Sequence, residues 1–204
     1  MTVPVHQTIL VVDVAGYSAA ERTTTDVTDL KKGLHHALKT AFDGSGVPWD
    51  QVRVEGCGDG YFVLVPGRFG KSVFVERFPA LLAEAVRVHN ARHRRQAHMQ
   101  LRMALHAGEV AYGEHGVTSP AINKTFSLVN AQVLRKALAE SGGVLALAVS
   151  SWFFDEVVRP SAMANAASYR RVRTRTISDV AWIARPDDPY SPKKLRGTRK
   201  LRFW

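Results

Sequence analysis

An aspartate interrupts an apolar, strand-like run near the start of the chain. Residues 8–15 read Thr-Ile-Leu-Val-Val-Asp-Val-Ala, so Asp13 falls where the pattern predicts a buried side chain. A carboxylate in a buried strand is costly unless a cation or hydrogen bonds compensate its charge. A second aspartate, Asp59, stands in a Gly-Asp-Gly sequence between two further apolar runs. Two carboxylates brought together from separate strands would suit a hard cation such as Mg²⁺ beside substrate phosphates.

The length and composition indicate one ordinary globular domain. The chain has 204 residues, of which 46% are hydrophobic and 23% charged, enough for a full core. The longest apolar stretch, around residues 144–154, is broken by two serines and is too short to span a bilayer. No basic segment followed by an apolar one opens the chain, so we expect no secretory signal. The single cysteine, Cys57, cannot form an internal disulfide, which favours a cytoplasmic location.

The net charge of +10 indicates attraction to polyanions, or else solvated basic surfaces. Basic residues cluster at 92–95, 170–175 and 193–202, and we interpret the first cluster as a solvated face. The last cluster contains no acidic residue and precedes a terminal Phe-Trp pair. We expect a catalytic domain over residues 1–185 and a basic tail over 186–204. The tail could be disordered, fold over an active site or touch an anionic surface; contact with nucleic acid or a membrane is not favoured.

The hydrophobic pattern predicts alternating strands and helices. The expected strands are 8–15, 51–57, 61–66, 101–106, 110–112, 144–149, 169–172 and 180–183, and the expected helices are about 27–42, 72–91, 123–138 and 151–158. This order predicts an α+β, ferredoxin-like (split βαβ) fold with an antiparallel sheet, helices on one face and a C-terminal α/β extension. In that topology the first strand and the second hairpin strand are neighbours. Asp13 and Asp59 can therefore share a cation.

Five short motifs resemble, in order, the catalytic domains of class III nucleotide cyclases. They are Asp13-Val14-Ala15-Gly16-Tyr17, Gly58-Asp59-Gly60, the segment Arg-Met-Ala-Leu-His-Ala-Gly over 102–108, Ala121-Ile122-Asn123 and Gly142-Gly143-Val144-Leu145. The resemblance covers most of residues 8–183. The compact chain is also similar to the standalone bacterial pyrimidine cyclases of antiphage (Pycsar) signalling.

The resemblance implies a mechanism that forms a cyclic nucleotide from a nucleoside triphosphate. Asp13 and Asp59 would hold two Mg²⁺ or Mn²⁺ ions per site, with the Val14 carbonyl as a further ligand. Backbone N–H groups around Gly16 and Tyr17 would approach the phosphates. Asn123 would orient the ribose or stabilise the transition state from the other subunit of a homodimer, because such sites form at the dimer interface. Asn123 could alternatively cap the helix that follows Pro120.

The base is partly readable from the position four residues before the second aspartate. Adenylyl cyclases of this family place lysine there and guanylyl cyclases place glutamate; this chain has Glu55. A carboxylate only accepts hydrogen bonds, from guanine, uracil N3–H or the cytosine amino group, so adenine fits least well. The segment 112–120 is short, with Thr118 and Ser119 as nearby polar candidates. We expect UTP or CTP, then GTP, and a downstream cyclic-nucleotide effector. Glu55 could equally be a solvent-facing strand residue.

One position departs from the family pattern. The family places arginine four residues after the asparagine, where this chain has Ser127. Loss of an arginine aimed at transition-state charge costs on the order of 10²–10³ in rate. Candidates to replace it are Lys124, Arg102, Arg135 and the basic tail. The alternative is a catalytically degenerate, cyclase-fold protein that binds nucleotide or regulates a partner.

Overall fold

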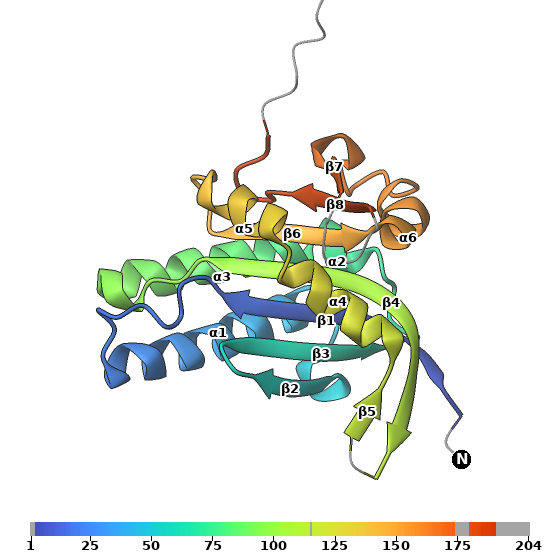
Figure 1. The fold of residues 1–204 in the computed structure, drawn as a ribbon, viewed down its shortest axis with the longest axis horizontal. Coiled ribbons are helices and arrows are strands. Elements are labelled where there is room, and N and C mark those ends of the chain that lie inside the picture. Colours follow the sequence, from blue (N-terminus) through green and yellow to red (C-terminus); the bar gives the residue numbers. More distant parts are fainter. Residues whose placement is uncertain (1–2, 115, 174–179, 191–204) are drawn as a thin grey trace, which may run out of the picture.

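The computed structural model describes residues 3–114, 116–173 and 180–190, which form an eight-stranded sheet flanked by helices (Figure 1). The strands are β1 (Val5–Val14), β2 (Arg53–Cys57), β3 (Gly60–Pro66), β4 (Leu101–Gly113), β5 (Gly116–Thr118), β6 (Leu145–Ser150), β7 (Arg170–Arg173) and β8 (Val180–Ala184). Their order across the sheet is β2-β3-β1-β4-β6-β8-β7, and β5 pairs with β4. The parts that bear on function are the ends of β1 and of the β2–β3 hairpin.

The first four strands confirm the ferredoxin-like prediction. β1 is antiparallel to both β3 and β4, so it lies at the centre of the β2-β3-β1-β4 unit. The extension adds β6 parallel to β4, followed by antiparallel β8 and β7. The two expected strands over 101–112 are one continuous strand, β4. β1 and β3 are therefore neighbours in the sheet, as predicted.

Helices cover both faces of the sheet: those of the ferredoxin-like unit lie on one face, as expected, and those of the C-terminal extension lie on the other (Figure 1). The helices are α1 (Thr24–Gly44), α2 (Val73–Glu76), α3 (Phe78–Arg92), α4 (Pro120–Val129), α5 (Gln132–Ala139) and α6 (Ser151–Phe153). α1 and α3 pack on one face, as the ferredoxin-like unit requires, whereas α4 and α5 of the extension pack on the other. None of the helices described has the length and apolar character needed to cross a bilayer.

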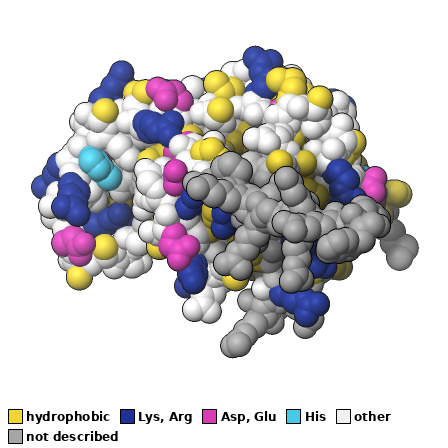
Figure 2. Space-filling view, turned by 90° about the horizontal axis from the view of Figure 1, so that it is seen from above, with side chains coloured by type: hydrophobic (Ala, Val, Ile, Leu, Met, Phe, Trp, Pro, Cys, Tyr) yellow, Lys and Arg dark blue, Asp and Glu magenta, His cyan; other side chains and the backbone are white. Residues whose placement is uncertain are grey.

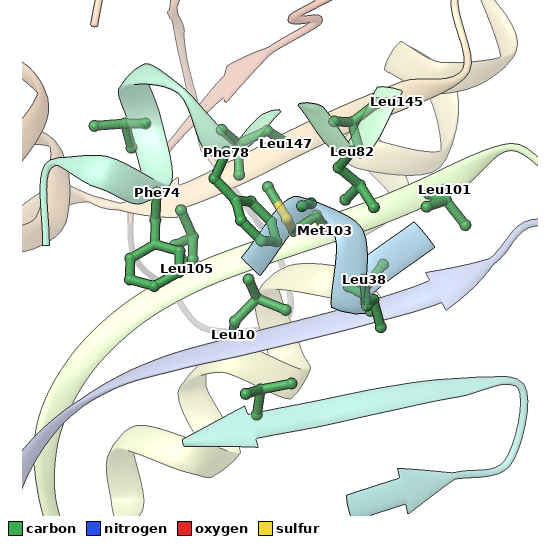
Figure 3. Packing of buried hydrophobic residues seen from close by; sticks show 14 of the residues in the cluster. Leu10, Leu38, Phe74, Phe78, Leu82, Leu101, Met103, Leu105, Leu145 and Leu147 are labelled. Atoms are coloured by element: carbon green, nitrogen blue, oxygen red, sulfur yellow. The ribbon is translucent and has the colours of Figure 1, made fainter. Parts of the chain in front are cut away.

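Two apolar cores enclose the sheet, and alternation along β1 assigns its side chains to them. Leu10 and Val12 enter the larger core under α1 and α3, with Leu38, Phe74 and Phe78 (Figure 3). Ile9 and Val11 enter the second core under α4 and α5, whose members include Phe62, Ala104, Leu128, Leu134 and Leu138. Asp13 continues the Ile9–Val11 row and so lies on the α4/α5 face.

Two expected helices are each divided. The helix expected over 72–91 breaks at Arg77, which ends α2 and precedes α3 with its proline in the first turn. The helix expected over 123–138 breaks at Asn130 and Ala131, where Ala131 takes an extended backbone (φ −61°, ψ 132°). The expected turn near 178–179 lies outside the described residues. The second break matters for the site, because it starts α5 in a new direction.

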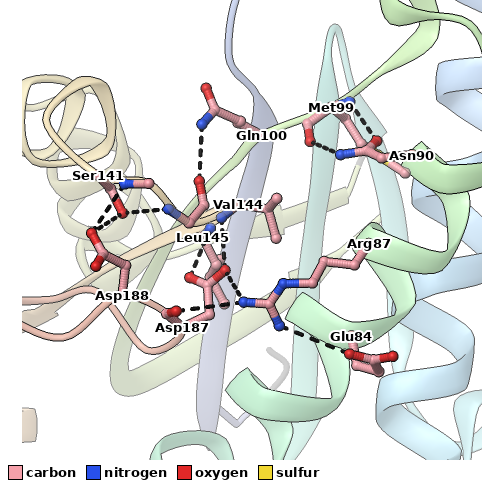
Figure 4. Close-up of polar contacts among 12 residues, drawn as sticks. Glu84, Arg87, Asn90, Met99, Gln100, Ser141, Val144, Leu145, Asp187 and Asp188 are labelled. Carbon is pink, nitrogen blue, oxygen red and sulfur yellow. Dashed lines mark hydrogen bonds and ion pairs between the residues drawn. The ribbon is translucent and has the colours of Figure 1, made fainter.

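The described chain continues past residue 185 in contact with the fold (Figure 4). Asp187 accepts a hydrogen bond from the Val144 N–H at 2.7 Å and pairs with Arg87 at 2.8 Å. Tyr190 lies against two guanidinium groups, those of Arg170 and Arg185. The basic cluster at 193–202 lies outside the described residues. On the face shown in Figure 2, Lys and Arg are interspersed with acidic and apolar side chains.

Candidate active site

Asp13 and Arg102 pair across neighbouring strands inside the protein. They are register partners in the β1–β4 ladder. Arg102 donates from Nε to Asp13 Oδ1 and from Nη2 to Oδ2, both at 2.9 Å. Asp13 is only 7% exposed and Arg102 only 8%. The charge that makes Asp13 costly in a strand is thus compensated by a bidentate arginine.

The pKa of Asp13 shows that its ionised form is still disfavoured despite the pairing with Arg102. Burial raises this pKa to about 6, and the neighbouring carboxylate of Asp59 adds to the rise. The guanidinium of Arg102, and the more remote one of Arg135, oppose the rise. A further cation between the two carboxylates would favour the ionised form.

The Gly-Asp-Gly turn sets Asp59 against the end of β1. Gly60 is the register partner of Asp13, and the Val14 N–H donates to the Asp59 carbonyl at 3.2 Å. Gly58 has φ +65°, which favours glycine. A Cβ on Gly60 would overlap the Val12 carbonyl oxygen. Both glycines are therefore needed for the turn to pack closely against β1. This packing places Asp59 near Asp13, at the end of β1.

The donor atoms fit a hard divalent cation. They are the carboxylate oxygens of Asp13 and Asp59, with the Val14 backbone alongside. Each carboxylate oxygen has two lone pairs, and Arg102 uses one on each oxygen of Asp13, so the others remain able to bind. Among the described residues no group of three or more His, Cys, Asp or Glu side chains is placed to hold a metal. The protein would supply two carboxylates, and phosphate oxygens, water and backbone would complete the shell, as is usual for Mg²⁺.

The turn after β1 borders a small cavity of about 100 Å³. Its lining includes Tyr17 and Lys31 from one side and Asp59 and Tyr61 from the other. Gly16, at the start of the turn, is exposed and has φ +64°. Val14, Tyr17 and Asp59 therefore line one cavity, and Asp13 lies close enough to Asp59 for their charges to interact.

Glu55 has a partner that the sequence reasoning missed. Arg53, two residues earlier on β2, donates from Nε to Glu55 Oε1 at 2.6 Å. The guanidinium of Arg53 also lies 5.5 Å from the ring centre of Tyr112. Residues i and i+2 of a strand share a face, so the pair could have been found from the sequence. Glu55 is opposite Phe62, hence on the α4/α5 face with Asp13.

The residues expected on the partner side of the site lie elsewhere on this chain. Asn123 is exposed in the first turns of α4, and Thr118 is exposed at the end of β5. Lys124 borders a different cavity, of about 360 Å³, together with His106 and Glu109. Neither Asn123, Thr118 nor Lys124 lines the cavity beside Asp59. One chain therefore does not bring the two halves of the expected site together.

Two details of α4 bear on the sequence interpretation. Ser119 caps the helix, because its Oγ accepts from the Ala121 N–H at 3.1 Å. The alternative role of Asn123 as the cap is therefore wrong. Ser127 Oγ donates back to the Asn123 carbonyl at 3.0 Å, as serine commonly does inside a helix. The position that carries an arginine in the resembled family thus offers a hydroxyl that is already engaged.

Comparisons with known proteins agree on the fold. No family model matches the chain. Human atrial natriuretic peptide receptor 2 is 34% identical over 119 residues, which cover 55% of this chain but only 11% of the receptor. The chain therefore spans about a tenth of that relative.

Solved structures match nearly end to end. An adenylate/guanylate cyclase/hydrolase from Silicibacter pomeroyi superposes with TM-score 0.62 and 18% identity, over 92% of this chain and all of the other. The adenylyl cyclase CyaB from P. aeruginosa gives TM-score 0.61 and 14% identity, over 92% and 98%. This chain therefore has the fold of the adenylyl and guanylyl cyclase domains.

Proposed function

We propose that the protein is a metal-dependent nucleotide cyclase, which converts a nucleoside triphosphate to a 3′,5′-cyclic monophosphate and pyrophosphate. The observation that carries this proposal is the pair of carboxylates where β1 ends and β3 begins. Asp13 is buried there despite its cost, and the Gly58–Gly60 turn brings Asp59 beside it. The cyclase fold supports the same chemistry.

The residues of one subunit would hold the metal ions and the phosphates. Asp13 and Asp59, with the Val14 carbonyl, would bind two Mg²⁺ or Mn²⁺ ions. When bound, such ions lower the pKa of the ribose 3′-hydroxyl and offset charge on the phosphates. Arg102 keeps Asp13 in a fixed orientation through its two hydrogen bonds. Backbone N–H groups around the exposed Gly16 and the half-buried Tyr17 would approach the phosphate oxygens.

The second half of the site would come from a second copy of the chain. Asn123, Thr118 and Lys124 lie away from the carboxylate edge, yet each is at the surface or at a cavity. A homodimer would place Asn123 of one copy at the ribose held by the other. The separation of the two halves within one chain supports this arrangement.

The base would be a pyrimidine, in UTP or CTP, with guanine next. The pair Arg53–Glu55 offers a donor and an acceptor side by side, and a pyrimidine edge carries both a carbonyl and an N–H or amino group. From the resemblance of the compact sequence to pyrimidine cyclases, we further propose a role in antiphage defence in the cytoplasm, with an effector that reads the cyclic product. The basic tail over 186–204 is not needed for this proposal.

The alternative is a degenerate cyclase-fold protein that binds nucleotide without turnover. Ser127 is the observation that favours it, because its hydroxyl bonds to Asn123 and provides no positive charge. An arginine restored at this position should raise activity if its absence is what limits the enzyme.

The decisive experiment is incubation with ATP, GTP, CTP and UTP separately, with Mg²⁺ and with Mn²⁺. Cyclic monophosphates are read by mass spectrometry. Cyclic UMP or cyclic CMP made by the wild type and lost in Asp13→Asn would support the proposal. Asp155→Asn is the matched control, because Asp155 pairs with Arg159 in an exposed helical turn. Absence of any cyclic product from a folded dimer would favour the degenerate alternative.

A further inference from the structure

A second cavity lies on the α5 side of the turn that follows β1. Its volume is about 340 Å³, within the range of small-molecule sites. The turn contributes Ala15 and Gly16, and β4 contributes Arg102. The remaining lining residues are Gln100, Arg135, Leu138 and Ala139. The cavity therefore adjoins the buried Asp13–Arg102 pair and the exposed Gly16 backbone at once.

Arg135 brings to this cavity a positive charge that no hydrogen bond or ion pair engages within the described residues. Its guanidinium is close enough to oppose the rise in the pKa of Asp13. No hydrogen bond or ion pair joins its side chain to any other residue in the described ranges. By contrast, the next residue, Lys136, pairs with Glu140 at 3.7 Å. Arg102 also lines the cavity, with two of its nitrogens bonded to Asp13. The described lining residues thus include two arginines and no Asp or Glu.

The break between α4 and α5 fixes Arg135 in this place. α5 restarts after Ala131 and buries Leu134 and Leu138 against the sheet. Leu134 immediately precedes Arg135, and Leu138 lines the cavity one turn later. The arginine is therefore carried by an anchored helix and not by a loose loop. A cationic side chain on a rigid support is what recognition of an anion requires.

We propose that this cavity binds the polyphosphate chain of a nucleoside triphosphate, with Arg135 as its principal cation, in the same subunit as Asp13 and Asp59. The identity of the ligand rests on the proposed cyclase function. A guanidinium presents paired N–H donors that match phosphate oxygens. On the opposite wall, Gly16 is exposed and has no side chain, so a phosphate group could come close to its backbone. Arg135 thereby supplies the positive charge that Ser127 does not.

The test compares Arg135→Ala with Lys136→Ala, the adjacent but ion-paired residue. Binding of inorganic tripolyphosphate is measured by calorimetry, with and without Mn²⁺. The Arg135→Ala variant should bind about 10- to 100-fold more weakly, as expected for loss of a charged hydrogen bond. Lys136→Ala should bind like the wild type. Arg135→Lys should recover only part of the affinity, because lysine keeps the charge but not the fork.

Kinetics on the active nucleotide separate this inference from the proposed function. In Arg135→Ala, the KM should rise by a factor similar to the loss of tripolyphosphate affinity. Equal tripolyphosphate affinity and equal KM in Arg135→Ala and the wild type would overturn the anion site. If the wild type forms no cyclic product but Arg135 still controls tripolyphosphate binding, the cyclase proposal fails and the anion site stands. Circular dichroism of each variant confirms that α5 remains folded.

Discussion

Asp13 and Arg102 compensate each other's burial through two hydrogen bonds of 2.9 Å across β1 and β4. Neither residue would be tolerated alone at this depth, since an unpaired buried charge is strongly unfavourable. The pair explains how the fold accepts a carboxylate at the end of its central strand. It also means that the carboxylate proposed to hold metal is oriented before any metal arrives.

Removal of Arg102 should destabilise the protein far more than removal of a surface arginine. Arg102→Ala leaves Asp13 buried and unpaired, which costs about 3–5 kcal/mol in comparable cases. Arg159→Ala breaks an exposed pair with Asp155 and should cost less than about 1 kcal/mol. The free energy of unfolding in urea distinguishes the two. Equal losses in both variants would mean that the Asp13–Arg102 pair is not needed for stability.

Gly60 should tolerate no side chain, unlike Gly56 on the same hairpin. A Cβ at Gly60 would overlap the backbone of Val12, whereas one at Gly56 would meet no atom within 4 Å. We expect Gly60→Ala to cost about 1–3 kcal/mol, the range for overpacking. Gly56→Ala should change the free energy of unfolding by less than about 0.5 kcal/mol. Thermal and urea unfolding of the two variants give the comparison; similar stabilities would contradict the tight packing of the turn against β1.

The neighbourhood of Asp13 and Asp59 was predictable because it depends on topology alone. The order of strands and helices predicts a ferredoxin-like sheet, and that sheet places the first strand beside the second hairpin strand. Arg102 as the partner of Asp13 was not predicted. Its identification needs the register of β1 against β4, which strand patterns do not specify.

The cover on the second face, by the helices of the C-terminal extension, also has a signature in the sequence. Residues 9–14 of β1 are all buried, and a continuous apolar run of this kind is typical of a strand covered on both faces. The division between α4 and α5 is harder to predict. Apolar residues continue through it, with Val129 and Leu134 both buried, so periodicity does not reveal the break at Asn130 and Ala131. The position of Arg135 follows from that break.

Acid should weaken the start of α1 through Asp26. Hydrogen bonds from Arg94, at 2.6 and 2.8 Å, and from Thr23 lower the pKa of Asp26 from 3.8 to about 2. A carboxyl whose folded-state pKa is depressed contributes stability above its unfolded pKa and loses it as the pH falls through the folded value. Between about pH 4 and pH 2, the wild type should therefore lose more unfolding free energy than Asp26→Asn. Parallel pH profiles of the two proteins would exclude this contribution.

Glu55 should influence which base is used. In Glu55→Lys an acceptor becomes a donor beside Arg53, which removes the partner for uracil N3–H or the cytosine amino group. We expect kcat/KM for UTP, CTP and GTP to fall at least about tenfold, with a smaller loss for ATP. Glu156→Lys, an exposed charge in the π-helical segment Phe154–Val158 that follows α6, is the control. A ratio of kcat/KM values among the four nucleotides that matches the wild type would assign Glu55 to the solvent-facing strand role.

Complementation between inactive variants should reveal a site shared by two chains. Asp13→Asn disables the metal half and Asn123→Ala the ribose half, so each homodimer should be inactive. In a mixed dimer of C₂ symmetry, one site collects both changes and the other collects neither. An equal mixture in which subunits exchange freely should therefore recover about a quarter of wild-type activity, since half of the dimers are mixed and each has one intact site. Cyclic nucleotide formation is measured before and after mixing. A mixture that stays inactive despite subunit exchange, shown by affinity tags on the two variants, would place both residues in the same half of the site.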